Sequence, residues 1–129
     1  MKNQVFYRCP ICGNLVGMIV DSGVTPVCCG KPMVKLEPGV SDGALEKHVP
    51  VFRAEDGQVQ VTVGEIPHPM TQDHFIQWIY MQTNMGGHRR CLKPQDEPAA
   101  CFMLCEGEQV IGVYAYCNLH GLWHKEWKE

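Results

Sequence analysis

The feature that most constrains this chain of 129 residues is its set of eight cysteines, five of which lie in tight spacing motifs. Clustered cysteines indicate disulfides in an exported protein, but together with histidines in a reducing cytoplasm they indicate bound metal. Polar Asn3, Gln4 and Arg8 interrupt the N-terminus, and the longest apolar run near it, residues 15–20, is too short for a signal peptide or a membrane span. We therefore expect a cytoplasmic protein, with no membrane partner, whose clustered cysteines bind metal.

The charge of the chain is nearly balanced, with 11 basic and 14 acidic residues and a formal net charge of −3. Nucleic-acid-binding domains usually carry a basic stripe interleaved with aromatic residues, and the sequence has no such stripe. We therefore expect no nucleic-acid partner.

Residues 1–37 form a cysteine-bearing head, which we expect to be a separate small domain. A segment this short buries too little apolar surface to fold unaided, so a structural metal is physically expected. Residues 37–43 contain Pro and Gly without periodicity and are typical of a linker. The second domain then covers residues 38–129.

The head contains two cysteine pairs of different spacing. Cys9 and Cys12 form the usual chelating pair, and Gly13 allows the tight turn that follows it. Cys28 and Cys29 are adjacent, so they cannot make the same knuckle and should impose a distorted tetrahedron of thiolates. Such a site suits zinc or iron. A structural zinc ribbon and, less favoured, disulfides remain alternatives from the cysteine pattern alone.

The second domain has the pattern of an antiparallel β-sandwich. Val59, Val61 and Val63 alternate with polar residues, and a Glu-Asp-Gly turn precedes them. No helical period longer than two turns is present. The expected strands cover residues 48–53, 58–65, 75–81, 88–92, 99–104 and 109–117.

A second set of metal-binding residue types lies at the strand ends and loops of this domain. Its members are His48, His68, His74, Cys117 and His120. We expect His48 to open a strand, and Cys117 and His120 to lie three residues apart on a turn. Imidazoles with a single thiolate favour redox iron or copper. His88 and His124 fit ordinary polar positions better.

Other metal chemistries fit this second set less well. A blue-copper site needs a weak axial methionine shortly after its Cys and His, but the last methionine here is Met103. A His-Glu-x-x-His zinc hydrolase motif is absent from the sequence. A non-catalytic electron carrier with two metal centres and a zinc-stabilised binding module remain competing hypotheses.

Four motifs together resemble the desulfoferrodoxin family of two-iron superoxide reductases over essentially the whole chain. They are Cys9-x2-Cys12-x15-Cys28-Cys29, Glu46-Lys47-His48-Val49-Pro50, His68-Pro69-Met70-x3-His74-x-Ile76-x-Trp78-Ile79 and Tyr116-Cys117-Asn118-Leu119-His120-Gly121. The resemblance implies an all-β fold, with a desulforedoxin-like metal domain (1–37) followed by an immunoglobulin-like antiparallel β-sandwich (38–129).

The resemblance also implies the chemistry of both sites. The four head cysteines would hold a distorted rubredoxin-like iron. His48, His68, His74 and His120 would be the equatorial ligands of a catalytic iron, with Cys117 as its axial thiolate and the sixth position open. The implied reaction is the one-electron reduction of superoxide to hydrogen peroxide without oxygen evolution, in defence against oxidative stress.

Further roles and partners follow from the same resemblance. Lys47 would attract superoxide and help to deliver protons, and Glu46 would occupy the sixth position in the resting ferric state. The implied partners are a rubredoxin-like electron donor and a second copy of the chain in a homodimer. Cys91, Cys101 and Cys105 match no ligand position. If the last two share a strand, they lie about 13 Å apart, too far for a disulfide.

Overall fold

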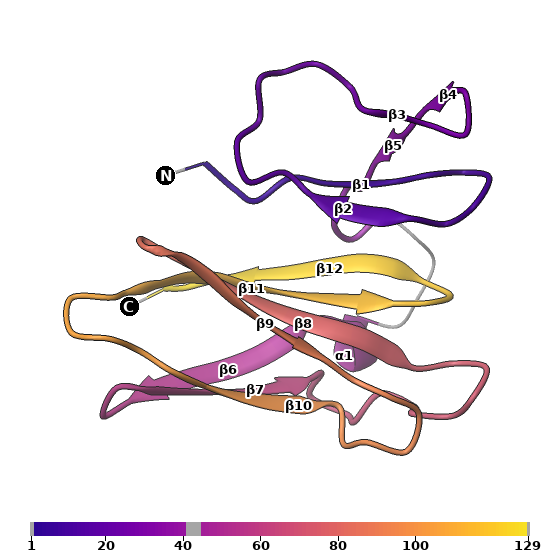
Figure 1. Ribbon diagram of the computed structural model, residues 1–129. Coiled ribbons are helices and arrows are strands. Elements are labelled where there is room, and N and C mark those ends of the chain that lie inside the picture. The colour runs from indigo at the N-terminus through magenta and orange to yellow at the C-terminus, as the bar shows by residue number, and fades with distance from the viewer. Residues whose placement is uncertain (1, 41–44, 129) are drawn as a thin grey trace. The chain divides into compact units, whose positions relative to one another are not determined.

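Apart from one helical turn, the described secondary structure consists of short antiparallel strands, and the chain falls into two units, residues 1–37 and 38–129. The computed structural model describes residues 2–40 and 45–128, without the side chain of Glu46. Figure 1 shows the course of the chain through both units. No helix in the described part is long and apolar enough to cross a membrane.

The first unit contains five very short strands. Strands β1 (Phe6–Arg8), β2 (Leu15–Gly17) and β5 (Val34–Lys35) form one sheet in the order β2-β1-β5, and β3 (Val27–Cys28) pairs with β4 (Lys31–Pro32). Its buried apolar cluster consists of Tyr7, Cys9 and Met33, with three partly buried neighbours. Ile19 remains 99% exposed. So small a core gives little hydrophobic stabilisation.

The second unit is a sandwich of two antiparallel sheets, which Figure 1 shows as two layers. Strands β6 (Pro50–Glu55), β7 (Gln58–Val63) and β10 (Ala99–Met103) form one sheet in the order β10-β7-β6. Strands β8 (Ile76–Thr83), β9 (Gly86–Cys91), β11 (Val110–Cys117) and β12 (Gly121–Glu126) form the other in the order β12-β11-β8-β9. This is an immunoglobulin-like division of strands between two sheets, so the predicted fold class is confirmed.

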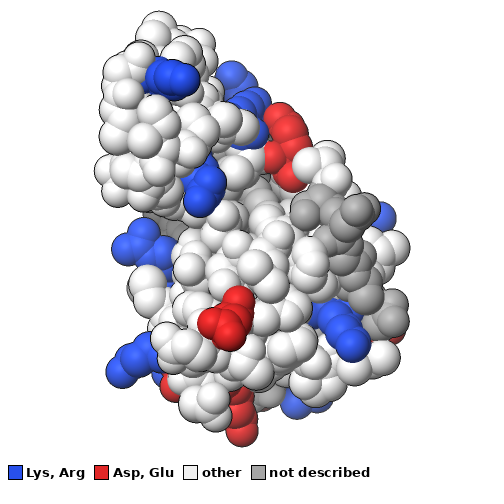
Figure 2. Space-filling model, turned by 90° about the vertical axis from the view of Figure 1, so that its right-hand side faces the viewer, with Lys and Arg blue, Asp and Glu red and all other residues white. Residues whose placement is uncertain are grey.

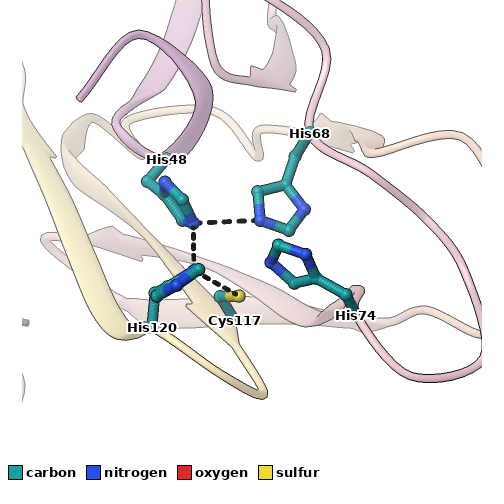
Figure 3. A group of neighbouring side chains, drawn as sticks. All are labelled: His48, His68, His74, Cys117 and His120. Carbon is teal, nitrogen blue, oxygen red and sulfur yellow. Dashed lines mark hydrogen bonds between the residues drawn. The ribbon is translucent and has the colours of Figure 1, made fainter. Parts of the chain in front are cut away.

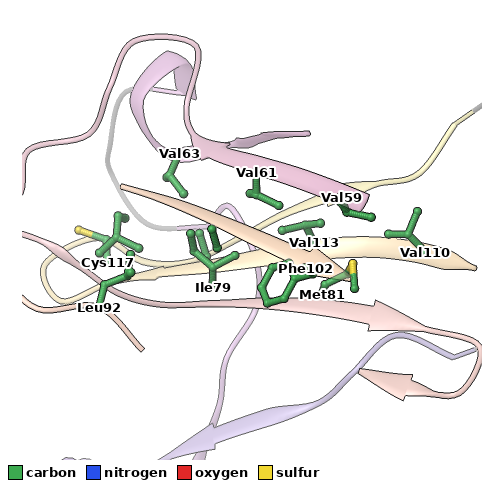
Figure 4. Packing of buried hydrophobic residues seen from close by; sticks show 13 residues of the cluster. Val59, Val61, Val63, Ile79, Met81, Leu92, Phe102, Val110, Val113 and Cys117 are labelled. Carbon is green, nitrogen blue, oxygen red and sulfur yellow. The ribbon is translucent and has the colours of Figure 1, made fainter. Parts of the chain in front are cut away.

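The core lies between the two sheets and is apolar (Figure 4). On β7, the residues Val59, Val61 and Val63 are at most 1% exposed, while the polar residues between them face outward. Ile79 and Met81 meet them from β8, and Val113 from β11. Alternation with a period of two residues therefore separates the core face of each strand from its outer face.

Two local features differ from the sequence-based expectations. His48 does not open a strand: it ends the single helical turn α1 (Leu45–His48), which the Val49 N–H to Leu45 carbonyl bond of 3.0 Å closes, and β6 begins only at Pro50. Strand β12 was not predicted, because its sequence carries charge as well as apolar residues. It forms because Gly121, with φ of 77°, turns the chain back along β11.

On the face that Figure 2 presents, Lys and Arg side chains are interspersed with Asp and Glu, and the described residues there form no broad patch of one sign. This distribution agrees with the nearly balanced charge of the chain.

A buried carboxylate fixes the turn that leads into β11. Glu108 accepts hydrogen bonds from the Thr83 hydroxyl (2.7 Å), from His88 Nε2 (2.9 Å) and from the Cys105 N–H (3.0 Å). These bonds, that of Thr83 first, lower the pKa of Glu108 from 4.5 to about 2. The carboxylate thus joins β8 and β9 to the turn, and His88 has a structural role.

We predict that Glu108→Gln lowers the free energy of unfolding by about 1–3 kcal/mol at neutral pH, because three donors lose a charged acceptor. The folded-state pKa is depressed, so this stabilisation is complete above pH 4.5 and is lost as the pH falls toward 2. Urea unfolding at several pH values measures it. Exposed Glu106 on the same turn is the matched control, and an equal loss in Glu106→Gln would contradict the assignment.

Candidate metal centres

Four histidines and one cysteine meet at one end of the sandwich (Figure 3). One ligand atom from each lies within 4.8 Å of the others. The group consists of His48, His68, His74, Cys117 and His120. The structure therefore brings together all five residues that the sequence singled out, although 72 positions separate the first from the last.

The five side chains come from four local structures of the second unit. His48 ends α1, and His68 and His74 lie in the connection between β7 and β8. Cys117 ends β11, where the register shifts: Tyr116 pairs with Trp78, but Cys117 pairs with Ile76. Such a β-bulge re-aims the side chain next to it. His120 follows on the tight turn before β12.

The nitrogen atoms are oriented as a ligand set. His68 Nδ1 lies 2.7 Å from the Pro69 carbonyl, so Nδ1 carries the proton and Nε2 offers its lone pair. That Nε2 is 3.0 Å from His48 Nε2, which is also 3.1 Å from His120 Nδ1. A single proton on His48 can satisfy only one of these neighbours. The buried Nε2 of His74 has no hydrogen-bond partner within the described part of the chain.

The electrostatics favour a cation among these atoms. Burial lowers the pKa of His68 to about 4 and also lowers the pKa of His74, so both imidazoles are neutral ligands at pH 7. Burial raises the pKa of the Cys117 thiol above its ordinary value, and hydrogen bonds from the Leu119 and His120 amides offset only part of this rise. A thiolate at this fully buried position needs a compensating positive charge. Four imidazoles and one thiolate fit a redox iron ion.

Two residues that the sequence analysis did not assign support the group. The Asn118 side chain accepts the Phe75 N–H (2.9 Å) and donates to the Asp73 carbonyl (3.0 Å), so it clamps the His74 loop to the turn after Cys117. Trp123 stacks on His48, with ring centroids 4.9 Å apart, and its Nε1 donates to the His120 carbonyl at 3.1 Å. The spacing of the ligand residues along the sequence does not indicate the supporting role of either Asn118 or Trp123.

The four head cysteines form a second group, with sulfur atoms also within 4.8 Å of one another. All eight cysteines of the chain are free. The Sγ atoms of Cys12 and Cys28 lie 3.7 Å apart, and those of Cys28 and Cys29 lie 4.0 Å apart, much longer than a disulfide bond. Cys29 adopts a φ of 55°, which lets two adjacent residues present their sulfurs to one point.

The head thiols cannot all ionise without a cation. Backbone hydrogen bonds, that of Cys12 first, lower the pKa of Cys9 to about 6. Interaction with the Cys12 thiol and the other sulfurs raises the pKa of Cys29 to about 12. An ion that binds four thiolates removes this conflict, so the head cysteines fit a tetrahedral zinc or iron ion.

The remaining candidate residues lie outside both groups. Lys47 is exposed on α1, beside the site, and its charge contributes to lowering the pKa of His74. Glu46 belongs to α1, but its side chain lies outside the described part. The cysteines that match no ligand position are all exposed: Cys91, Cys101 and Cys105. His124 lies outside both groups and stacks on Tyr114, with ring centroids 4.2 Å apart.

Comparisons with known proteins agree over both units. The family model "Desulfoferrodoxin" matches residues 40–126, and "Desulfoferrodoxin, N-terminal domain" matches residues 1–36. A desulfoferrodoxin from Syntrophotalea carbinolica is 46% identical over 120 residues, which cover 93% of this chain and 94% of the relative. A superoxide reductase from Pyrococcus horikoshii is 39% identical over 98 residues, covering 63% of this chain and 85% of the relative.

A solved structure has the same architecture. The superoxide reductase from Treponema pallidum superimposes with a TM-score of 0.82 at 32% identity, and the match covers 97% of this chain and 100% of that one.

We predict that Asn118→Ala weakens Fe2+ binding at the histidine-rich group by about 10–100-fold, because the His74 loop loses its clamp. Anaerobic metal titration followed by ligand-to-metal absorption measures this. Asn84 is a matched control, since it clamps Gln109 N–H and Gly107 carbonyl in the same way at another turn. Asn84→Ala should cost stability but leave the affinity unchanged. Equal affinities in both variants would refute the clamp.

Proposed function

The chain belongs to the desulfoferrodoxin family, and we propose that it is a superoxide reductase with two iron centres. It reduces superoxide by one electron to hydrogen peroxide, evolves no oxygen, and serves in defence against oxidative stress. The observation that carries this function is the convergence of four imidazoles and one buried cysteine on a single point. The matches to proteins named superoxide reductase support the same activity.

We propose nine iron ligands. Cys9, Cys12, Cys28 and Cys29 hold one iron in the head, and His48, His68, His74, His120 and Cys117 hold the catalytic iron. Iron held by the second set of residues would supply the one-electron redox chemistry. The reaction then consumes one superoxide, one electron and two protons for each hydrogen peroxide.

The protein environment tunes the cysteine ligand. The amides of Leu119 and His120 donate to the Cys117 sulfur and favour its thiolate form. The fully buried sulfur is shielded from water and from oxidants. His68 is held by its bond to the Pro69 carbonyl, and His48 by Trp123, so the ligand rings keep their orientation. A preorganised ligand set of this kind needs little rearrangement during turnover.

We assign roles to two residues of α1, Lys47 and Glu46. Lys47 lies next to His48, and its ammonium group attracts the superoxide anion toward the site. Through water it also helps to supply the protons that the peroxide product needs. We assign to Glu46 the role of a further ligand, which would bind the ferric ion at rest and would be released on reduction.

The remaining parts of the proposal concern partners and location. A rubredoxin-like protein returns the electron after each turnover, and the chain forms a homodimer. Eight free cysteines suit a reducing compartment, which supports a cytoplasmic location.

The function is tested by mixing the fully reduced, iron-loaded protein with superoxide. We expect stoichiometric hydrogen peroxide and no oxygen from the protein-dependent reaction, measured with a peroxide assay and an oxygen electrode. Release of one oxygen for every two superoxide anions consumed would identify a dismutase instead. Colourless protein with zinc alone at both sites, even after anaerobic preparation with iron, would favour a binding module.

We also predict that Lys47→Ala slows the reaction with superoxide by about tenfold or more at low salt, because the local attraction for the anion is lost. Pulse radiolysis over a range of ionic strengths measures the rate, and the variant should respond less to salt than the parent. The iron spectrum should not change. Lys93, exposed in a different loop, is the control; if Lys93→Ala slows the reaction equally, Lys47 has no special role.

A further inference from the structure

The four-stranded sheet carries a row of oxidisable side chains on its outer face. Tyr116 of β11 pairs with Trp78 of β8, and Trp78 pairs with Cys91 of β9. Their neighbours Ile79 and Ala115 belong to the core cluster. Because successive side chains of a strand point to opposite faces, Tyr116, Trp78 and Cys91 share the outer face. We call these three residues the Cys91 row.

The row connects the surface with the histidine-rich centre. Tyr116 is bonded directly to Cys117 through the backbone. Its ring stacks on that of Trp78, with centroids 5.6 Å apart and an angle of 5° between the planes, an offset-stacked geometry. Trp78 and Tyr116 are only 8% and 6% exposed, whereas Cys91 is exposed on the edge strand β9. Cross-strand neighbours lie about 4.5–5.5 Å apart, so no long gap interrupts the row.

A neighbouring row provides a comparison. Tyr80 and Tyr114 also pair across β8 and β11 on the outer face, but their rings are tilted by 45° with centroids 6.3 Å apart. Tyr114 is three residues from Cys117 in sequence, whereas Tyr116 is next to it. Of these two cross-strand pairs, Trp78–Tyr116 is the one that contains the residue adjacent in sequence to the proposed ligand Cys117.

The position of the row suits electron entry. In the proposed function Lys47 attracts superoxide, whereas the Cys91 row reaches the site through the Cys117 sulfur, so the electron and the substrate use different residues. Aromatic π-systems and a sulfur atom couple electronically better than aliphatic side chains. Arg89, on the same face of β9 two residues from Cys91, gives the entry point positive charge, which complements a donor protein with an acidic surface.

We infer that the Cys91 row is the path by which an electron from an acidic one-electron donor protein, docked at β9, reaches Cys117 and the iron it holds. This inference rests on the proposed function. The donor loses one electron and the ferric centre gains it to become ferrous. No bond forms or breaks in the transfer, and no proton moves.

The path is tested by attaching a photoactive ruthenium complex to Cys91 of the full, iron-loaded chain in which Cys101 and Cys105 are replaced by Ser. After a flash, the decay of the ferric absorption gives the rate of electron transfer. We expect Trp78→Leu to slow this transfer by an order of magnitude, and Trp78→Phe, which keeps a stacked ring, to slow it less. Tyr80→Leu, in the neighbouring row, should leave the rate unchanged.

Two further measurements keep the test independent of catalysis and of folding. With zinc in place of iron, the photo-oxidised label should produce the transient absorption of a tryptophan radical, which Trp78→Leu should abolish and Tyr80→Leu should retain. A label on Cys101 of the other sheet, with Cys91 and Cys105 replaced by Ser, should transfer electrons to the iron more slowly than the Cys91 label.

Equal rates in the parent and Trp78→Leu, or equal rates from Cys91 and Cys101, would overturn the proposed path. Neither measurement uses superoxide, so a protein that produced no peroxide but showed the expected rates would refute the proposed function and leave the path intact.

Discussion

The shift in register between β8 and β11 is the constraint on which the histidine-rich centre depends. It lets Tyr116 face outward opposite Trp78 while the next residue, Cys117, turns into the core opposite Ile76. The thiol thereby ends a strand that is hydrogen-bonded on both sides, which makes its position rigid. The four imidazoles come from less regular segments and are held by individual contacts, such as the Asn118 clamp and the stacked Trp123. A rigid sulfur with supported imidazoles is a preorganised ligand set.

Much of this arrangement was predictable from sequence, for identifiable reasons. The alternation at Val59, Val61 and Val63 indicated a strand with one buried face, and the continuous apolar run of β8 indicated a buried one. The candidate ligands were recognisable because Cys and His residues clustered in such motifs are typical of metal sites. The expectations that were wrong concern two short segments. The helical turn that ends at His48 depends on a single backbone hydrogen bond before Pro50. Strand β12 depends on its pairing with β11. The supporting roles of Asn118 and Trp123 are set by contacts across the fold, so no local pattern indicates them.

The two units reach stability by different means. The sandwich encloses a continuous apolar core and a buried, fully bonded carboxylate at Glu108, so its framework forms without help from an ion. The head buries little beyond Tyr7, Cys9 and Met33. Its order therefore depends on the ion that neutralises its thiols, and we expect the head to respond to chelators more strongly than the sandwich framework.

The edges of the sandwich have a consequence for the behaviour of the protein at high concentration. Open strands at the ends of both sheets present unpaired backbone groups that can recruit strands from other molecules and seed fibrils. Here β6 starts with a proline and carries Arg53, while β9 combines two glycines with Arg89 and Arg90. Proline lacks a donor, glycine disfavours extended structure, and like charges repel a second copy of the same edge. These features disfavour pairing of β6 and β9 with the same strands of another molecule.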